Sequence, residues 1–226
     1  MPPAIINSNT VTSLNERKET GVFYPMLLRK NIMEQLNAKT KPKQLISITG
    51  LVLTSMFTAL LCVLAQITIP TQPIPFTLSL FAIYLIGALL PPRYALLSVI
   101  SYILLGAFGL PVFANMRGGL PALTGVTGGF IMAYPFMALL TSLSYRYAKK
   151  WNIVALTVGM IFSLLLCYLF GSLWFSFSTG SGLRKALALC VYPYVLFDLI
   201  KITLAVSFSQ VIRVSLRKAF RDIKII

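Results

Sequence analysis

Long apolar runs, separated by short polar or proline-rich breaks, make up most of the chain. The first run, residues 45–69, contains 25 uncharged, mostly apolar residues. A helix of that length crosses a hydrocarbon core of about 30 Å. Three prolines within residues 70–75 then end the helix and favour an extended loop, because proline cannot continue a helix. The pattern predicts a transmembrane helix followed by an outer loop.

The later runs have the same character. Residues 78–90 form an apolar stretch of only 13 residues, about 20 Å as a helix, so this helix must be short, tilted or extended into its flanks. A loop rich in glycine and proline is predicted over 110–126. Further helices are predicted over 94–109, 127–147, 151–178 and 186–212, which gives an all-α membrane protein with six transmembrane helices in a compact bundle.

Composition supports a membrane protein over a soluble enzyme. Hydrophobic residues make up 57% of the chain and charged residues only 11%, against roughly 25% charged residues in soluble domains. The mean hydropathy is +0.82. A single soluble core of this size leaves about a quarter to a third of its unfolded surface in water, which is too much for so apolar a chain. Membrane lipid is the expected environment.

The charge is strongly positive, with 20 Lys and Arg against 5 Asp and Glu, no histidine and a net charge of +15. The basic residues flank apolar runs, which is typical of membrane proteins and not of nucleic-acid binding modules. With both termini cytoplasmic, sixteen basic residues lie in inner segments, three lie in outer loops and Lys201 lies within a helix. We therefore expect a multi-pass protein of the cell membrane with a basic cytoplasmic leader (1–44), a transmembrane substrate-binding domain (45–212) and a basic cytoplasmic tail (213–226).

Catalytic, metal and cofactor sites are not expected. The chain has no histidine, and its cysteines, Cys62, Cys167 and Cys190, share no short spacing, so neither a zinc site nor a disulfide framework is indicated. No Gly-Lys dipeptide occurs, which excludes a Walker A phosphate loop. The protein is predicted not to be an enzyme, and any ATP must be bound by another chain.

One charged pair lies inside the predicted membrane region. Asp198 is the single acidic residue between positions 45 and 212, and Lys201 follows it by three positions, on the same helix face. Each charge costs about 2.5 to 3.5 kcal/mol at the centre of an isolated transmembrane helix, so both are expected to face the interior and each other or a ligand. Three interpretations stay open: a packing ion pair, the polar anchor of a substrate pocket, or a proton carrier in a secondary transporter.

Other positions have both a functional and a structural interpretation. The Tyr192-Pro193-Tyr194 segment predicts a proline kink beside a cavity, or ordinary packing. Ser55 and Ala59 form a small-x-x-x-small face that permits close helix contact, a pattern that is also common by chance. Arg117, in an outer loop, either attracts an anionic solute or is simply solvated.

Five ordered motifs between residues 45 and 212 resemble the BioY family, the biotin-specific S components of energy-coupling-factor (ECF) vitamin transporters. The motifs are Ile-Pro-Phe-Thr-Leu at 74–78, Pro-Arg at 92–93 with Tyr-Ile-Leu-Leu-Gly at 102–106, Gly-Leu-Pro-Val-Phe-Ala at 109–114, Gly-Val-Thr-Gly-Gly-Phe at 125–130, and Asp-Leu-Ile-Lys at 198–201.

The resemblance implies a six-helix protein that captures biotin from the outer side of the membrane. It places Asp198 at a ureido N–H of biotin and Lys201 at the ureido carbonyl or the carboxylate, with Arg117 or backbone N–H groups of the third loop as alternatives for the carboxylate. The remaining implied substrate contacts are Phe76, Asn115, Thr127, Gly128 and Tyr192. An ECF coupling membrane protein and two ATPase subunits are the implied partners, and Ser55 and Ala59 lie on the helix that would meet the coupling protein.

The sequence also departs from the family pattern. Ser79 and Leu80 stand where a glutamine and a small polar residue are expected, Asn115 and Met116 replace glycines, Val126 replaces a proline, and Leu196-Phe197 replaces Pro-Gly. These changes predict a reshaped pocket. A proton-coupled secondary transporter, an S component for another small vitamin and a purely structural membrane protein remain as alternatives.

Overall fold

A computed structural model of the chain describes residues 48–147 and 152–219. These residues belong to one compact unit, Ile46–Ile226. The predicted leader over 1–44 and the end of the predicted tail, 220–226, lie outside the described residues.

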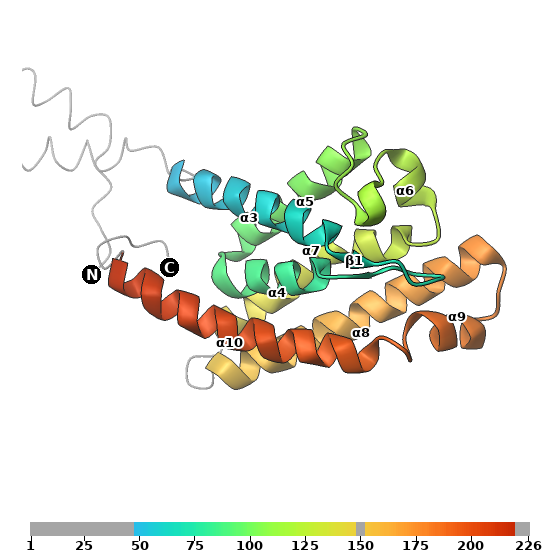
Figure 1. The fold of residues 1–226 in the computed structure, drawn as a ribbon. Helices are drawn as coiled ribbons and strands as arrows, with labels where there is room; N and C mark the ends of the chain where they lie inside the picture. The colour runs from blue at the N-terminus through green and yellow to red at the C-terminus, as the bar shows by residue number, and fades with distance from the viewer. Residues whose placement is uncertain (1–47, 148–151, 220–226) are drawn as a thin grey trace, which may run out of the picture. The chain divides into compact units, whose positions relative to one another are not determined.

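The first five predicted helices are confirmed, with ends shifted by a few residues (Figure 1). The largest shift is at the end of the first helix, which stops before the position expected at residue 69. These helices are α3 (Ile48–Gln66), α4 (Ser79–Leu89), α5 (Pro92–Ala107), α7 (Gly128–Tyr147) and α8 (Asn152–Thr179).

The prediction of a single sixth helix over 186–212 is wrong, because the structure divides this segment into two helices. A short helix, α9 (Leu183–Cys190), is followed by four turn residues and a long helix, α10 (Val195–Ala219). Pro193 lies in this turn. Proline has no backbone N–H to donate, and its ring clashes with the preceding helical turn, so a continuous helix is disfavoured here. α10 also extends beyond the expected end at Ile212, so that Arg213 lies within it and stacks on the ring of Tyr145 at 3.4 Å.

The first loop and the glycine- and proline-rich loop contain structure that the hydrophobic pattern did not predict. In the first loop, β1 (Thr68–Ile69) pairs antiparallel with β2 (Phe76–Thr77), with Thr68 opposite Thr77. The glycine- and proline-rich loop holds a short 3₁₀ helix, η2 (Ala114–Met116), and a short helix, α6 (Leu120–Thr124). Both loops lie near the same end of the helices as the turn between α9 and α10 (Figure 1).

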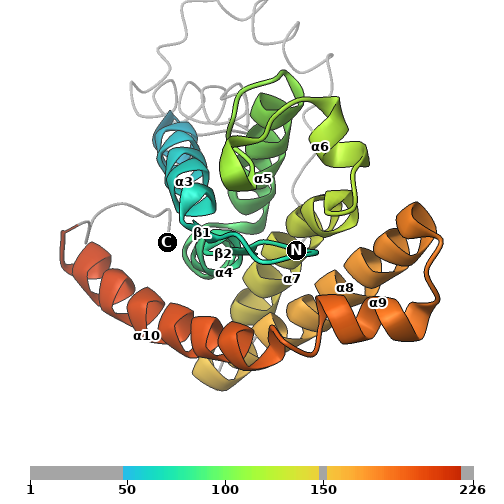
Figure 2. The same ribbon diagram turned by 45° about the vertical axis from the view of Figure 1, so that its right-hand side comes forward.

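Helix α4 lies at the centre of the helices, in contact with α3, α5, α7 and α10 (Figure 2). Its 11 residues are nearly all buried, including every residue from Ala82 to Leu89, and they extend only about 16 Å. Among the described residues, four helices (α3, α7, α8 and α10) are long and apolar enough to cross a membrane, while α4 and α5 are shorter apolar helices.

Helices α7 and α8 pack closely because glycines lie where they meet. A Cβ atom at Gly129 of α7 would lie 2.2 Å from Cβ of Trp174, and one at Gly171 of α8 would lie 2.2 Å from the ring of Phe130. Larger side chains do not fit at either position. Helix α8 in turn contacts α10 (Figure 2).

Candidate substrate-binding site

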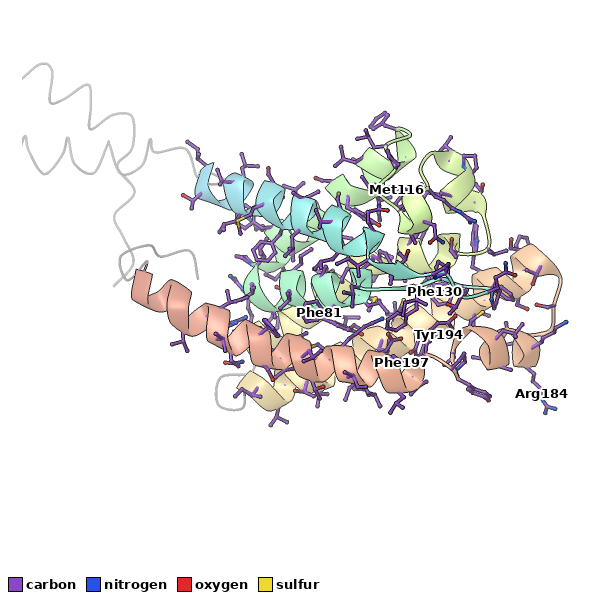
Figure 3. The ribbon with its side chains drawn as sticks, viewed as in Figure 1. Phe81, Met116, Phe130, Arg184, Tyr194 and Phe197 are labelled. Carbon is purple, nitrogen blue, oxygen red and sulfur yellow. The ribbon has the colours of Figure 1, made fainter. Side chains whose placement is uncertain are left out.

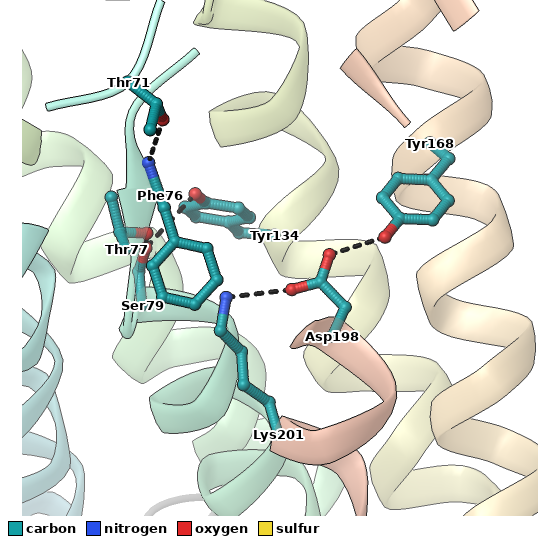
Figure 4. Close-up of polar contacts among 8 residues, drawn as sticks. All are labelled: Thr71, Phe76, Thr77, Ser79, Tyr134, Tyr168, Asp198 and Lys201. Carbon is teal, nitrogen blue, oxygen red and sulfur yellow. Dashed lines mark hydrogen bonds and ion pairs between the residues drawn. The ribbon is translucent and has the colours of Figure 1, made fainter. Parts of the chain in front are cut away.

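Asp198 and Lys201 lie in the first two turns of α10, and both are buried. Asp198 is 2% exposed and Lys201 is 4% exposed. Nζ of Lys201 donates a hydrogen bond to Oδ1 of Asp198 at 2.8 Å (Figure 4). The prediction that the two charges face the protein interior and each other is confirmed. Buried charges in proteins are generally paired in this way, because an isolated charge in an apolar medium is very costly.

The second oxygen of this carboxylate is held from another helix. The hydroxyl group of Tyr168, on α8, donates to Oδ2 of Asp198 at 2.5 Å. Tyr168 is itself buried. The carboxylate is therefore fixed on both sides by donors, and its orientation relative to α8 and α10 is set (Figure 4).

The hairpin in the first loop places an aromatic ring over the lysine. Nζ of Lys201 lies 3.9 Å from the centroid of the Phe76 ring, a cation–π contact. The same ring meets Phe197 edge to face, with centroids 5.3 Å apart. The backbone N–H of Phe76 donates to Oγ1 of Thr71 at 3.2 Å, which helps to hold the hairpin in place.

A cavity of about 60 Å³ adjoins the ion pair. Its walls are mostly apolar or aromatic, and its polar groups gather at the charged pair. This combination of apolar walls and a few convergent polar groups is typical of a small-molecule site. The lining residues come from β2, the five helices α4, α7, α8, α9 and α10, and the segments next to them: Ile74, Pro75, Phe76, Thr77, Leu80, Phe130, Tyr134, Cys167, Tyr168, Cys190, Tyr194, Asp198 and Lys201.

A second cavity of about 60 Å³ adjoins the first and is bounded by the glycine- and proline-rich loop. Asn115, Arg117 and Thr127 line it, and Arg117 is exposed. The two cavities share five lining residues, so they are neighbouring parts of one site: Ile74, Pro75, Thr77, Phe130 and Tyr134. The combined site has an ion pair at one end and a separate cation at the other.

Two residues predicted to contact substrate line neither of these cavities. Tyr192 is 72% exposed and lines neither cavity. Its neighbour Tyr194 lines the first cavity, and its hydroxyl donates to the carbonyl oxygen of Ile74 at 2.5 Å. Gly128 is also absent from both linings; a Cβ atom there would lie 1.8 Å from the carbonyl oxygen of Leu123. The structure thus shows a packing role for Gly128.

Ser55 and Ala59 lie on the exposed face of α3, together with Val52 and Met56. The hydroxyl of Ser55 donates to the carbonyl oxygen of Leu51 within the same helix, so it does not project as an unsatisfied polar group. Neither residue lines a cavity. Their role in partner contact stays a prediction.

Sequence reasoning missed Tyr134 and Tyr168, and it named Tyr194 only as part of the 192–194 segment; all three line the first cavity. Phe130 comes from α7, whereas Tyr194 comes from the turn between α9 and α10 (Figure 3). A tyrosine in an apolar helix has no pattern that separates a pocket wall from ordinary packing. Ser79, singled out as a departure, places its hydroxyl beside those of Thr77 and Tyr134, the latter at 3.4 Å.

Comparison with known proteins identifies the family. A family model described as the BioY family matches residues 35–218. The chain is 38% identical over 155 residues to a protein named "Biotin transporter BioY" from Thermotoga maritima, covering 69% of this chain and 90% of that one. It is 35% identical over 158 residues to a protein named "Probable biotin transporter BioY" from Pyrococcus horikoshii, covering 70% and 92% of the two chains.

A solved structure supports the same relationship at the level of the fold. The crystal structure of the S-component for biotin from an ECF-type ABC transporter matches with a TM-score of 0.68 and 25% sequence identity, over 74% of this chain and 91% of that chain. The family match, the identities and the shared fold agree, and the chain belongs to the BioY family.

Proposed function

We propose that this protein takes up biotin as the substrate-binding S component of an ECF-type transporter. Its relatives are named biotin transporters, and the structure that it resembles is an S-component for biotin. The observation that carries the proposal is the buried Asp198–Lys201 pair facing a cavity whose far end holds Arg117.

The chemistry of biotin fits the two ends of this site. Its ureido ring has two N–H donors and a carbonyl acceptor, which complement the Asp198 carboxylate and the Lys201 ammonium group. Its sulfur-containing ring and aliphatic chain suit the shared apolar walls, including Phe130 and Ile74. Its carboxylate then meets Arg117 at the outer end, since Lys201 is already engaged with Asp198 and the Phe76 ring.

We further propose that six segments cross the cell membrane and that both termini lie in the cytoplasm. The four long apolar helices supply four segments, and α4 and α5 supply two, with α4 shielded from lipid by its neighbours. The excess of Lys and Arg in the inner segments supports this orientation. In it, the two cavities open toward the outer side, where biotin would be captured.

The proposed partners are an ECF coupling membrane protein and two ATPase subunits. The chain has no Walker A motif, so energy from ATP must enter through another protein. The exposed face of α3 around Ser55 and Ala59 is apolar and carries small side chains, which suits close contact between membrane helices.

A proton-coupled secondary transporter is the alternative, because a carboxylate lies inside the membrane region. Asp198 is the only acidic residue between positions 45 and 212, and its two oxygens are bonded to Lys201 and Tyr168. A proton relay usually needs a chain of titratable groups. The sequence offers no second acid and no histidine for one, which favours the S component.

Binding and uptake together separate these proposals. Purified protein in detergent, without ATP, should bind biotin at a ratio of one to one in a calorimetric titration, and thiamine and riboflavin should not compete. Uptake in cells that supply the coupling protein and ATPases should require those partners. Absence of biotin binding would contradict the proposal, and partner-independent uptake that an uncoupler abolishes would favour the secondary transporter.

A further inference from the structure

The loop that carries Arg117 contains two consecutive residues in an unfavourable backbone conformation. Asn115 has φ 59° and Met116 has φ 56°, both in the left-handed region that glycine adopts freely. Asparagine is tolerated there because its side chain can form local hydrogen bonds, whereas methionine is rarely found there. Met116 is 69% exposed, so packing of its side chain does not hold this conformation. Another contact must do so.

Gln66, the last residue of α3, supplies that contact through both ends of its amide group. Its Nε2 donates to the carbonyl oxygens of Pro111 at 3.0 Å and Phe113 at 3.1 Å. Its Oε1 accepts the backbone N–H of Met116 at 3.1 Å. One side chain thus forms hydrogen bonds with three backbone groups of the loop, two before Asn115 and one at Met116.

The next residues of the same segment extend this connection to the first outer loop. Oγ1 of Thr68 donates to Oδ1 of Asn115 at 2.9 Å. Thr68 also pairs across the hairpin with Thr77, next to the Phe76 ring that covers Lys201. Residues 66–68 therefore connect the glycine- and proline-rich loop to the hairpin and fix their relative positions. Asn115 and Arg117 of that loop line the second cavity, which we call the outer cavity.

We propose that Gln66 is a positioning residue for the carboxylate end of the substrate. It does not line either cavity. It holds residues 111–117 in their strained conformation and so places Arg117, whose carbonyl oxygen accepts the N–H of Phe113 at 2.9 Å, at the outer cavity. This inference rests on the proposed function for its ligand, and it concerns only the outer end of the site, remote from the Asp198–Lys201 pair.

Gln66→Ala in the full chain tests this role with two ligands. The probes are biotin and biotinol, in which an alcohol replaces the carboxylate. Gln66→Ala should lower affinity for biotin about tenfold and affinity for biotinol less than about threefold, because only biotin uses the positioned cation. Gln210→Ala is the matched control: it removes the same side chain from α10, where Gln210 lines neither cavity.

Relief of strain gives a second, more specific test. In the Gln66→Ala background, Met116→Gly should restore part of the biotin affinity, because glycine adopts φ near +56° without penalty. Gln66→Glu, which keeps the acceptor for the Met116 N–H and loses the amide donors, should be intermediate. Three results would each overturn the positioning role: an equal loss of affinity for biotin and biotinol in Gln66→Ala, an unchanged biotin affinity, or no recovery of biotin affinity when Met116→Gly is added.

Hydrogen exchange in the ligand-free protein makes the inference independent of biotin binding. The amide of Met116 should exchange faster in Gln66→Ala than in the unmutated chain, while α8 amides stay unchanged. Unchanged exchange at Met116 would overturn the inference. If the unmutated chain binds neither ligand, the proposed function fails, and the exchange result still decides whether Gln66 holds the loop.

Discussion

The hydroxyl group of Tyr168 on α8 donates a buried hydrogen bond of 2.5 Å to Oδ2 of Asp198 on α10. Because Lys201 occupies Oδ1, both oxygens of the carboxylate have a protein donor. Each oxygen of an ionised carboxylate can accept about two hydrogen bonds, so acceptor capacity remains for ligand N–H groups. The tyrosine therefore orients the acceptor and leaves it able to bind substrate.

Removal of this hydroxyl group should weaken biotin binding without unfolding the protein. Tyr168→Phe deletes one hydrogen bond to a charged group, for which about 1.5 to 3 kcal/mol is typical, and frees the carboxylate to rotate. We expect biotin affinity to fall roughly tenfold to a hundredfold in calorimetric titration. Tyr147→Phe, at a tyrosine that is 81% exposed, is the matched control; an equal effect of the two substitutions would argue against the orienting role.

Phe76→Leu tests the ring that covers Lys201. The change removes the cation–π contact and the edge-to-face contact with Phe197, and a cation–π contact contributes about 0.5 to 2 kcal/mol. Biotin affinity should decrease severalfold. Phe81→Leu is a suitable control, since the Phe81 ring pairs edge to face with Phe208 at 6.0 Å and lines neither cavity. Equal binding by both variants would contradict a role of the Phe76 ring in the site.

Arg117→Gln tests the outer end of the site. The substitution should lower affinity for biotin about tenfold and leave biotinol almost unaffected, because the lost interaction is with a carboxylate. Arg117 is exposed, so the difference from the unmutated chain should narrow as salt rises. Arg184→Gln is the control, because Arg184 on α9 points away from the body of the structure (Figure 3). An equal loss of affinity for biotin and biotinol would show that Arg117 does not bind the biotin carboxylate.

Gly128→Ala distinguishes packing from substrate contact at the start of α7. A Cβ atom there would lie 1.8 Å from the carbonyl oxygen of Leu123, a backbone atom that cannot simply rotate away. We expect a loss of stability of about 1 to 3 kcal/mol, as is usual for overpacking, seen as a lower unfolding temperature in detergent. The protein that remains folded should bind biotin with unchanged affinity. If the variant is stable but binds biotin more weakly, Gly128 contacts the substrate after all.

The helices and the charged pair were predictable because each has a strong local signal. An uncharged run such as 45–69 has few alternatives to a membrane helix, and two charges spaced three apart on an apolar helix must face inward together. The break of the sixth helix was only suggested by Pro193. Its exact position depends on how α9 and α10 pack, which residue spacing does not express.

The rest of the site depends on contacts between distant segments. Tyr168 reaches Asp198 from 30 positions earlier in the chain, and Gln66 reaches Met116 from 50 positions earlier. Neither residue has a sequence pattern of its own. The sequence shows Asn115 and Met116 where the family resemblance leads us to expect glycines, but only the backbone angles show that both residues adopt a positive φ.

The most direct test of the central proposal uses the double variant Asp198→Asn/Lys201→Met. Removal of one member of a buried ion pair leaves an unpaired charge and typically costs about 3 to 5 kcal/mol, whereas replacing both members is often nearly neutral. The double variant should therefore stay folded with an unfolding temperature near that of the unmutated chain. It lacks the carboxylate charge and the cation that we assign to the ureido ring, and the introduced asparagine keeps only one acceptor oxygen and adds an NH2 donor that opposes the ureido N–H groups.

Calorimetric titration with biotin, on the unmutated chain and on this folded double variant, is the decisive measurement. We expect one biotin per chain for the unmutated protein and no detectable binding by the double variant. Equal binding by the two proteins would show that the Asp198–Lys201 pair only stabilises the packing of α10, and absence of binding by the unmutated chain would contradict the biotin site altogether.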